Sequence, residues 1–399
     1  MNKRTVLVWF RNDLRIRDNE ILSRACERAE RIIPVFCFDP RYYSITKYGT
    51  RKTGLFRTRF IHESVKQLQD FFKSINGNLI IKYGLPEEEI PLLAAKYKVD
   101  EVYHHREVAH EETFVSDLVE DSLWRLKINL RHFIGHTLFH KEDFPFPVKD
   151  IPDSFEVFQK KLERETTIRE CFETPLTMNF PEDLEDTEVP TLEQLGFNQD
   201  EIEKYKTSGF IGGEREANNR LSSILEGTLS EDEFVLSPWL ATGSLSVHSV
   251  YFSITQSDLP KKVKERIIQG LWWKDYFRFM FKKHGNIFFQ EGGYTGKPPV
   301  LADNQDLSFQ KWKEGNTLDP NINIIMQQLD ETGYIDFHSR MVSASYLIDV
   351  LKVNWLLGAA YFEEKLIDYA PSSNYGNWAH MAGVGSSSNH NRGASEKIL

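Results

Sequence analysis

The residues from 368 to 385 are the part of this sequence best suited to chemistry. They read Asp-Tyr-Ala-Pro-Ser-Ser-Asn-Tyr-Gly-Asn-Trp over 368–378 and Ala-Gly-Val-Gly over 382–385. Gly376 lets a backbone come close to a ligand, Asn374 offers an amide donor and acceptor, and Trp378 offers a flat, easily oxidised ring. Together they indicate the lining of a buried site for a flat conjugated cofactor. A packed Gly/Ser-rich hairpin or helix entry is the structural alternative.

At the other end of the chain, the sequence predicts strands that alternate with helices. Four apolar runs have the length and composition of strands, at residues 5–10, 31–38, 78–83 and 101–104. Helical segments separate them at residues 18–28, 57–75 and 86–97. Strands that alternate with helices fold into a parallel sheet with helices on both faces. We therefore predict a doubly wound, Rossmann-like α/β domain over residues 1–135.

After the α/β domain, the sequence predicts two further regions, a connector and a helical domain. Residues 136–205 are rich in Glu, Pro and Thr with little sustained periodicity, so we predict an inter-domain connector wrapped over the surface. Helical patterns follow at residues 247–256, 263–283, 321–330, 337–351 and 358–368. They predict an all-α domain over residues 206–399. The expected fold class is thus α/β followed by all-α, and 399 residues exceed the usual size of one hydrophobic core.

The composition restricts the class of protein. A net charge of −10 argues against a generally basic nucleic-acid binder, although local basic rims at residues 261–266 and 282–284 are candidates. The three cysteines, Cys26, Cys37 and Cys171, have no metal-ligand spacing, which predicts a reduced intracellular protein without a metal site. The first residues run into a strand without a signal peptide, and no apolar run is long enough to cross a membrane. We therefore expect a cytoplasmic protein.

The stretch at 374–378, with Ala-Gly-Val-Gly after it, resembles the flavin-site signature of the photolyase/cryptochrome family in its DASH-type branch. The run Arg-Asn-Asp-Leu-Arg-Ile-Arg-Asp-Asn at 11–19 resembles that family's Arg-x-Asp-Leu-Arg-x-x-Asp-Asn signature, which carries the fold and not the chemistry. Residues 212–221 resemble the start of a helix in the flavin domain. The resemblance covers nearly the whole chain. It implies a blue-light-absorbing flavoprotein that holds flavin adenine dinucleotide (FAD) among its helices.

The resemblance also assigns individual residues to the cofactor. Ser237 stands at a phosphate-contacting position, and Asn374 would face the flavin N5. Arg340 and Asp368 would form an ion pair beside the ring, because a buried guanidinium without a partner is costly. The full set of cofactor-binding positions is Ser237, Pro238, Leu240, Trp273, Arg340, Asp368, Asn374 and Trp378.

Three tryptophans match the family's electron-transfer chain. Trp378 would lie next to the ring, Trp355 in the middle and Trp312 at the surface end. Each one alone could equally pack a core. Glu142 occupies the place of the acidic residue that helps hold a folate antenna, methenyltetrahydrofolate, in the DASH-type branch. A turn that ends the domain is the alternative for the residues around it.

Several departures from the family pattern fall on substrate-contacting positions. Gly270 replaces a Glu that contacts the damaged bases, and Lys274 replaces an Arg. Phe337 and His338 replace an Asn-Arg pair, so hydrogen bonds to a flipped-out pyrimidine dimer are lost. Glu233 stands near the adenine side, where a carboxylate would repel the diphosphate unless it points away.

Lys274, Phe337 and His338 are the positions expected to face DNA, single-stranded or damaged, with weakened binding. Two functions are open. One is a DNA photolyase that uses photoexcited FAD and the tryptophan chain on pyrimidine dimers. The other is a non-repairing photoreceptor or binding module that kept the fold and lost its substrate contacts.

Overall fold

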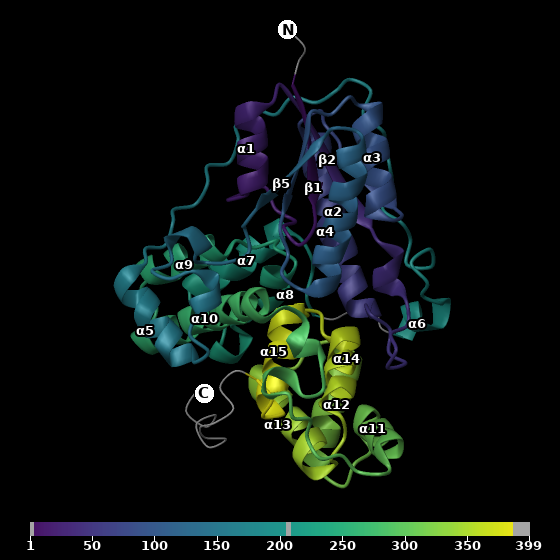
Figure 1. Ribbon diagram of the computed structural model, residues 1–399, viewed down its shortest axis with the longest axis vertical. Helices are drawn as coiled ribbons and strands as arrows, with labels where there is room; N and C mark the ends of the chain where they lie inside the picture. Colours follow the sequence, from purple (N-terminus) through teal and green to yellow (C-terminus); the bar gives the residue numbers. More distant parts are fainter. Residues whose placement is uncertain (1–3, 205–208, 386–399) are drawn as a thin grey trace.

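The computed structural model describes residues 4–204 and 209–385. Figure 1 shows an α/β domain at the top and helices below it, with α11 to α15 forming the lowest part of the molecule. The elements of the α/β domain are β1 (Thr5–Phe10), α1 (Glu20–Arg28), β2 (Arg31–Phe38), α2 (Leu55–Ser74), β3 (Ile80–Tyr83), α3 (Pro86–Lys96), β4 (Glu101–His105), α4 (His110–Arg125) and β5 (Asn129–Phe133).

The sheet is parallel throughout, with strand order β3-β2-β1-β4-β5. The central strand β1 is buried along its whole length, because helices cover both faces of the sheet. A strand buried on both faces reads as a continuous apolar run, which is why residues 5–10 and 31–38 are recognisable in the sequence. The predicted fold class is confirmed.

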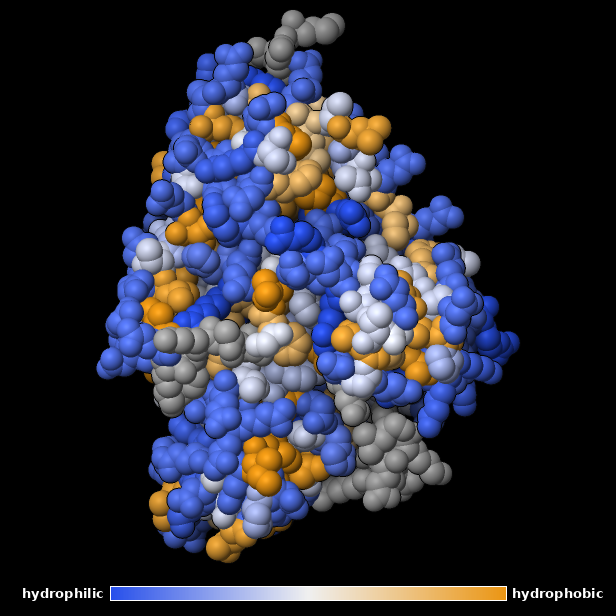
Figure 2. All heavy atoms as spheres, turned by 180° about the vertical axis from the view of Figure 1, so that it is seen from behind, coloured by the Kyte–Doolittle hydropathy of each residue, from blue (hydrophilic) through white to orange (hydrophobic). Residues whose placement is uncertain are grey.

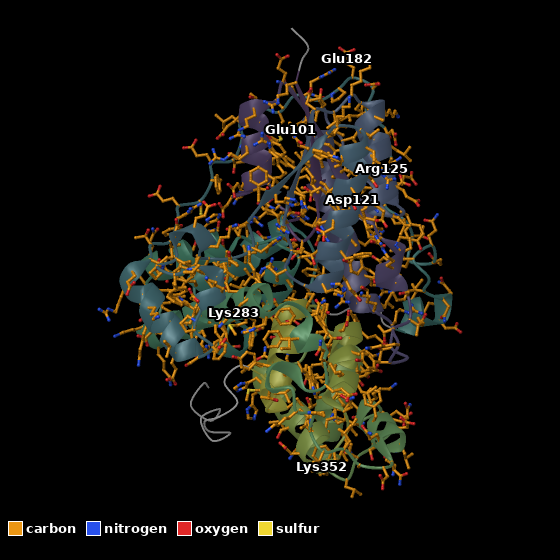
Figure 3. The ribbon with its side chains drawn as sticks, viewed as in Figure 1. Glu101, Asp121, Arg125, Glu182, Lys283 and Lys352 are labelled. Carbon is orange, nitrogen blue, oxygen red and sulfur yellow. The ribbon has the colours of Figure 1, made fainter. Side chains whose placement is uncertain are left out.

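The edge strand β5 was not predicted. Its sequence, Asn-Leu-Arg-His-Phe, buries one side only, and Arg131 reaches across to Glu101 of β4 with 2.6 Å between Nε and Oε1. Glu101, labelled in Figure 3, also accepts a hydrogen bond from Tyr103. An edge strand with charged residues on its open side lacks the apolar run that marks the central strands.

The predicted connector is not irregular throughout. Helix α5 (Phe155–Glu165) packs three apolar side chains, Phe155, Phe158 and Leu162, into the helical core. Farther along, the carbonyl of Asn179 accepts a hydrogen bond from the Ile32 amide, so this part of the chain adds to the α/β domain instead. The short helix α6 (Gln199–Lys204) follows. The described part of the predicted connector therefore contributes to both cores.

The helical domain is built mostly of short helices around one large core. That core contains Trp312, Trp355 and Trp378. A π-helical turn, Tyr346–Val350, interrupts the segment predicted as one helix over 337–351. The remaining elements are α7 (Glu214–Leu225), α8 (Ser237–Ala241), α9 (Val247–Gln256), α10 (Lys261–His284), α11 (Gln305–Lys313), α12 (Pro320–Thr332), α13 (Phe337–Ser345), α14 (Trp355–Lys365) and α15 (Pro371–Met381).

The signature at residues 11–19 joins the two domains. Arg15 donates to the Gly243 carbonyl at 3.0 Å, and the Leu14 amide donates to the Thr242 carbonyl at 3.2 Å. Gly243 has φ +65°, and a Cβ there would lie 1.9 Å from the Asn12 carbonyl oxygen, so only glycine permits this approach. The structural role expected for this signature agrees with these contacts.

The surface is mixed in character. Figure 2 shows hydrophilic residues over most of the rear face, with hydrophobic residues in separate patches. Among the described residues, no helix is both long enough and apolar enough to span a membrane.

Candidate functional site

A cavity of about 500 Å³, here called the ring pocket, lies among α13, α14 and α15. The stretch at 368–378 supplies half of its lining, partly because Pro371 begins α15 and starts a helix whose one face is turned to the pocket. The lining residues are Phe337, Arg340, Met341, Ala344, Phe362, Leu366, Asp368, Tyr369, Ala370, Ser373, Asn374, Asn377, Trp378 and Met381.

Arg340 and Asp368 form the expected ion pair, with 2.8 Å between Nη2 and Oδ2. The same carboxylate oxygen accepts a hydrogen bond from Ser237 Oγ at 2.6 Å. Burial alone would lower the pKa of Arg340, but the Asp368 carboxylate opposes this and holds the guanidinium pKa above its ordinary value. The other oxygen, Asp368 Oδ1, is buried without a hydrogen-bond partner among the described residues. It is therefore an acceptor left for a ligand.

Asn374 offers a second acceptor. Its Nδ2 donates to the Ala359 carbonyl at 2.9 Å, which leaves the amide oxygen for a ligand. Gly376, by contrast, serves helix packing, since a Cβ there would lie 2.3 Å from the Phe277 ring of α10. The close approach expected at Gly376 is thus made by another helix.

The tryptophans are arranged differently from the expectation. Trp378 lines the ring pocket, and the Trp312 ring centroid lies 6.2 Å from that of Trp378 at an interplanar angle of 77°. Trp312 is 0% exposed and Trp355 only 1% exposed, so the placement of Trp312 at the surface end is wrong. The physical reason is that Phe309 and Trp312, one turn apart on α11, both turn inward. Tyr361, which the sequence did not single out, lies 5.7 Å from Trp312.

The other predicted cofactor residues lie outside the ring-pocket lining. Pro238 is buried in α8, and Leu240 packs partly buried against the helical core. Trp273 stacks on Phe155 of α5 with 3.7 Å between ring centroids. Of the α8 residues, Ser237 alone is connected to the ring pocket here, through its hydrogen bond to Asp368.

The positions expected to face DNA separate into two places. Phe337 lines the ring pocket and is 46% exposed, and His338 beside it is exposed. Lys274 instead donates from Nζ to the His136 carbonyl at 2.7 Å, and burial, with Arg278 nearby, lowers its pKa to about 8. This inward hydrogen bond directs the ammonium group toward the domain interface. Gly270 is exposed, and a Cβ there would meet no atom within 4 Å.

One carboxylate, that of Asp153, contacts two of the three residues of the candidate basic rim at 282–284. Lys283, labelled in Figure 3, and His284 both contact Asp153 Oδ1, at 2.7 and 3.0 Å. Glu233 is exposed and accepts hydrogen bonds from Ser230, which lower its pKa. The Glu233 carboxylate therefore accepts its hydrogen bonds from Ser230, within the same short turn.

Glu142, the antenna candidate, lies on the surface. Its side chain is 68% exposed and approaches His140 at 3.7 Å and Arg169 at 3.8 Å. It lines neither the ring pocket nor the second cavity that is described next.

That second cavity, of about 980 Å³, lies where β1 and β2 end against the helical domain and is called here the interdomain cavity. In parallel sheets, ligands bind at such carboxyl ends, next to the point where the strand order reverses. Tyr369 lines both cavities. The lining includes Trp9, Phe10, Arg11, Asn12, Phe36, Cys37, Phe38, Asp39, Tyr42, Tyr43, Lys52, Thr53, Arg57, Glu112, Glu363, Ile367 and Tyr369.

The α/β domain, followed by a helical domain that contains the ring pocket, defines the fold, and comparisons with known proteins identify the family. The family model for DNA photolyase matches residues 6–180, and the one for the FAD binding domain of DNA photolyase matches residues 267–393. The chain belongs to the photolyase/cryptochrome family and is a flavoprotein of that type, with FAD as its cofactor. The ring pocket fits this cofactor, with two free acceptors, an ion pair and an indole around it.

Several relatives are DASH-type cryptochromes. The chain is 35% identical to the Cryptochrome DASH of Natronomonas pharaonis, covering 96% of this chain and 84% of the relative. The crystal structure of the Synechocystis sp. cryptochrome superposes with a TM-score of 0.90 at 33% identity, covering 98% and 84%. An archaeal photolyase structure from Sulfolobus tokodaii with two FAD molecules has a TM-score of 0.79 at 26% identity, covering 99% and 86%.

Proposed function

We propose that this protein is a light-driven flavoprotein in which Trp378 donates an electron to photoexcited flavin, and which repairs pyrimidine dimers weakly or not at all. The observation that supports it is the ring pocket, where Trp378 and Asn374 share one lining with the Arg340–Asp368 pair. Bound FAD supplies the light absorption and the one-electron redox chemistry. The protein supplies the placement of the ring and the electron donor.

Each ring-pocket residue has a distinct part in this proposal. Asp368 Oδ1 and the Asn374 amide oxygen would accept hydrogen bonds from the flavin, because both are free to do so. Arg340 offsets the negative charge of Asp368, so the pocket holds a compensated pair. After Trp378 has donated its electron, the oxidised Trp378 would take an electron first from Trp312, whose ring contacts it. Electron transfer from Trp355 would be a competing route.

Action on DNA is the less supported half of the family's chemistry for this chain. A flipped-out base must recover a few kcal/mol of lost stacking and pairing from the pocket that receives it. Phe337 at the ring pocket can offer stacking, while Gly270 offers no carboxylate and Lys274 points to the His136 carbonyl. These substitutions favour the non-repairing photoreceptor, the second function that the sequence left open.

One experiment tests both halves. The purified protein is examined for flavin absorption bands, illuminated with blue light, and assayed with a single-stranded oligonucleotide that carries one pyrimidine dimer. We expect flavin bands that bleach under illumination and little light-dependent repair. A colourless preparation would refute the flavin proposal, and rapid repair would refute the proposed loss of substrate contacts.

An antenna chromophore has two candidate positions. A folate at Glu142 follows from the resemblance, but that carboxylate is exposed and lies beside Arg169. The interdomain cavity is larger and lined by aromatic rings, and the structure of the Sulfolobus tokodaii relative is described as containing two FAD molecules. Identification of the small molecules released on denaturation decides this. A released folate that is lost in Glu142→Gln but not in Arg57→Gln supports the surface position.

A cytoplasmic location stays a prediction. Its support is that Cys26, Cys37 and Cys171 are all free thiols in the structure.

A further inference from the structure

Tyr361 of α14 lies at the end of a row of aromatic rings that starts at the ring pocket. Trp378 lines that pocket, and its ring centroid lies 6.2 Å from that of Trp312. The Trp312 centroid lies in turn 5.7 Å from that of Tyr361, at an interplanar angle of 66°. Three helices of the lowest part of the molecule, α11, α14 and α15, supply one ring each (Figure 1). The phenol is therefore two ring contacts away from the residue that lines the pocket.

The other rings around Trp312 are poor electron donors. Within the described residues, its remaining ring neighbours are Phe309 at 6.1 Å and Phe362 at 5.9 Å between centroids. A phenyl ring is much harder to oxidise than an indole or a phenol. An oxidised Trp312 therefore finds its next electron, in the direction away from the ring pocket, at Tyr361.

Trp312 has no group nearby that could take its proton. An oxidised indole is a radical cation, and it becomes neutral only when its N–H proton leaves. Trp312 is fully buried, and its Nε1–H donates to the Ser343 carbonyl at 3.1 Å. A backbone carbonyl accepts a hydrogen bond but is too weak a base to remove the proton. The positive charge would therefore stay in the apolar core, where it is costly, until an electron arrives.

Tyr361 can lose its proton more easily, because its hydroxyl reaches the end of a helix. The ring is buried, but its Oη donates to the carbonyl of Lys313, the last residue of α11, at 3.3 Å. The Nζ atoms of Lys313 and Lys365 lie 5.7 and 5.6 Å from the Tyr361 ring centroid. Two ammonium groups oppose a further positive charge on the ring. They therefore favour release of the hydroxyl proton when the ring is oxidised.

We propose that Tyr361 is the last electron donor of the light reaction and holds the oxidising equivalent as a neutral tyrosyl radical. This inference rests on the proposed function in so far as the first electron leaves Trp378. One electron passes from the Tyr361 ring to oxidised Trp312, the Tyr361 O–H bond breaks, and the proton goes to solvent. Trp312 returns to its reduced, uncharged state. No positive charge remains on the three rings, and the return of the electron from the flavin is slowed by the two ring contacts between them.

The test uses the FAD-loaded protein with oxidised flavin, excited by a blue laser flash. Transient absorption follows the tryptophan and flavin radicals. Electron paramagnetic resonance of protein made with ring-deuterated tyrosine identifies a tyrosyl radical, because its lines become narrower. The variants are Tyr361→Phe, which keeps the ring, and Tyr251→Phe as the matched control. Tyr251 is a partly buried tyrosine against the same helical core, and its ring contacts Phe252 with 5.3 Å between centroids.

We expect a tyrosyl radical in the parent and in Tyr251→Phe, and its formation should be slower in D2O because a proton leaves in the same step. Tyr361→Phe should lose this signal, keep an oxidised tryptophan in its place, and return to the resting flavin faster than the parent. Trp312→Phe should also lose the tyrosyl signal, because it removes the ring that joins Tyr361 to Trp378. The FAD content and the urea unfolding of the apoproteins show separately whether a variant is altered in structure.

A tyrosyl radical that persists in Tyr361→Phe would overturn the assignment, as would a photoreduced parent without any tyrosyl radical or an unchanged flavin-radical lifetime in Tyr361→Phe. Each of these results leaves the proposed function standing, provided that Trp378→Phe slows photoreduction. Photoreduction of Trp378→Phe at the rate of the parent would instead refute the proposed donor and, with it, the row of rings that starts there. If Tyr361→Phe fails to hold FAD, the deuterated-tyrosine spectra of the parent and of Trp312→Phe decide the assignment.

Discussion

Removing the carboxylate of Asp368 while keeping its shape should destabilise the ring pocket more than any surface charge change. In Asp368→Asn, Arg340 loses its ion pair and Ser237 Oγ loses a charged acceptor. Deleting one partner of a buried pair typically costs about 3–5 kcal/mol. The Arg340 side chain is 23% exposed and keeps its 2.9 Å bond to the Ile335 carbonyl, so we expect the lower end, about 3 kcal/mol.

A double-mutant cycle isolates the pair from these side effects. Asp368→Asn, Arg340→Met and the double variant are unfolded in urea without FAD, and FAD retention is measured in parallel. A coupling energy of about 1–3 kcal/mol is expected for residues in one buried network. The exposed pair Lys66–Asp70, with 3.0 Å between Nζ and Oδ1, serves as the control and should give about 0.3–0.5 kcal/mol. Additivity of the Asp368 and Arg340 changes within about 0.5 kcal/mol would show that the pair contributes nothing to stability.

Four further changes test other parts of the structure. Trp378→Phe should slow flavin photoreduction strongly, because phenylalanine is harder to oxidise; a rate equal to that of the parent under the same lamp would contradict the donor role. Trp312→Phe, which removes the indole 6.2 Å from Trp378, should shorten the lifetime of the light-induced tryptophan radical in transient absorption, and an unchanged lifetime would count against this route. Gly270→Glu combined with Phe337→Asn should raise light-dependent dimer repair, since the space at Gly270 is open; no gain would mean that these positions were overinterpreted. The pKa of Lys274 is lowered from 10.5 to about 8, so the unfolded chain binds its proton more readily and the free energy of unfolding should rise between about pH 8 and 10.5. Lys274→Met should flatten that rise in urea titrations, and an identical pH profile would contradict the burial argument.

The substitutions at the positions expected to contact the substrate would affect DNA binding, and they leave the residues expected to hold FAD unchanged. In the proposed function, placement of FAD would depend on the ring pocket, which has the Arg340–Asp368 ion pair and free acceptors. In the proposed function, contact with DNA would depend on other groups, and Gly270, outside the ring-pocket lining, and Phe337, on that lining, both lack the hydrogen-bonding groups expected from the family. A chain can therefore keep its light chemistry while losing its substrate, because the two sets of residues stabilise different molecules.

The sequence by itself determined the features that depend on local pattern. The strands at 5–10 and 31–38 were placed with their observed bounds, because a strand buried on both faces must be a continuous apolar run. Helix α9 likewise has its predicted bounds, 247–256. The Arg340–Asp368 pair was expected from the family resemblance, and the cost of an unpaired buried guanidinium agrees with it.

The tertiary structure alone decided which distant side chains meet. The burial of Trp312 against Trp378, the hydrogen bond from Lys274 to the His136 carbonyl and the helical packing of α5 all join segments far apart in the chain. The strand β5 was missed because an edge strand needs one buried face only. Tyr369 lines both the ring pocket and the interdomain cavity only because the helical domain packs against the carboxyl ends of β1 and β2. Periodicity records whether a side chain is buried, whereas its neighbours are set by the packing of the complete chain.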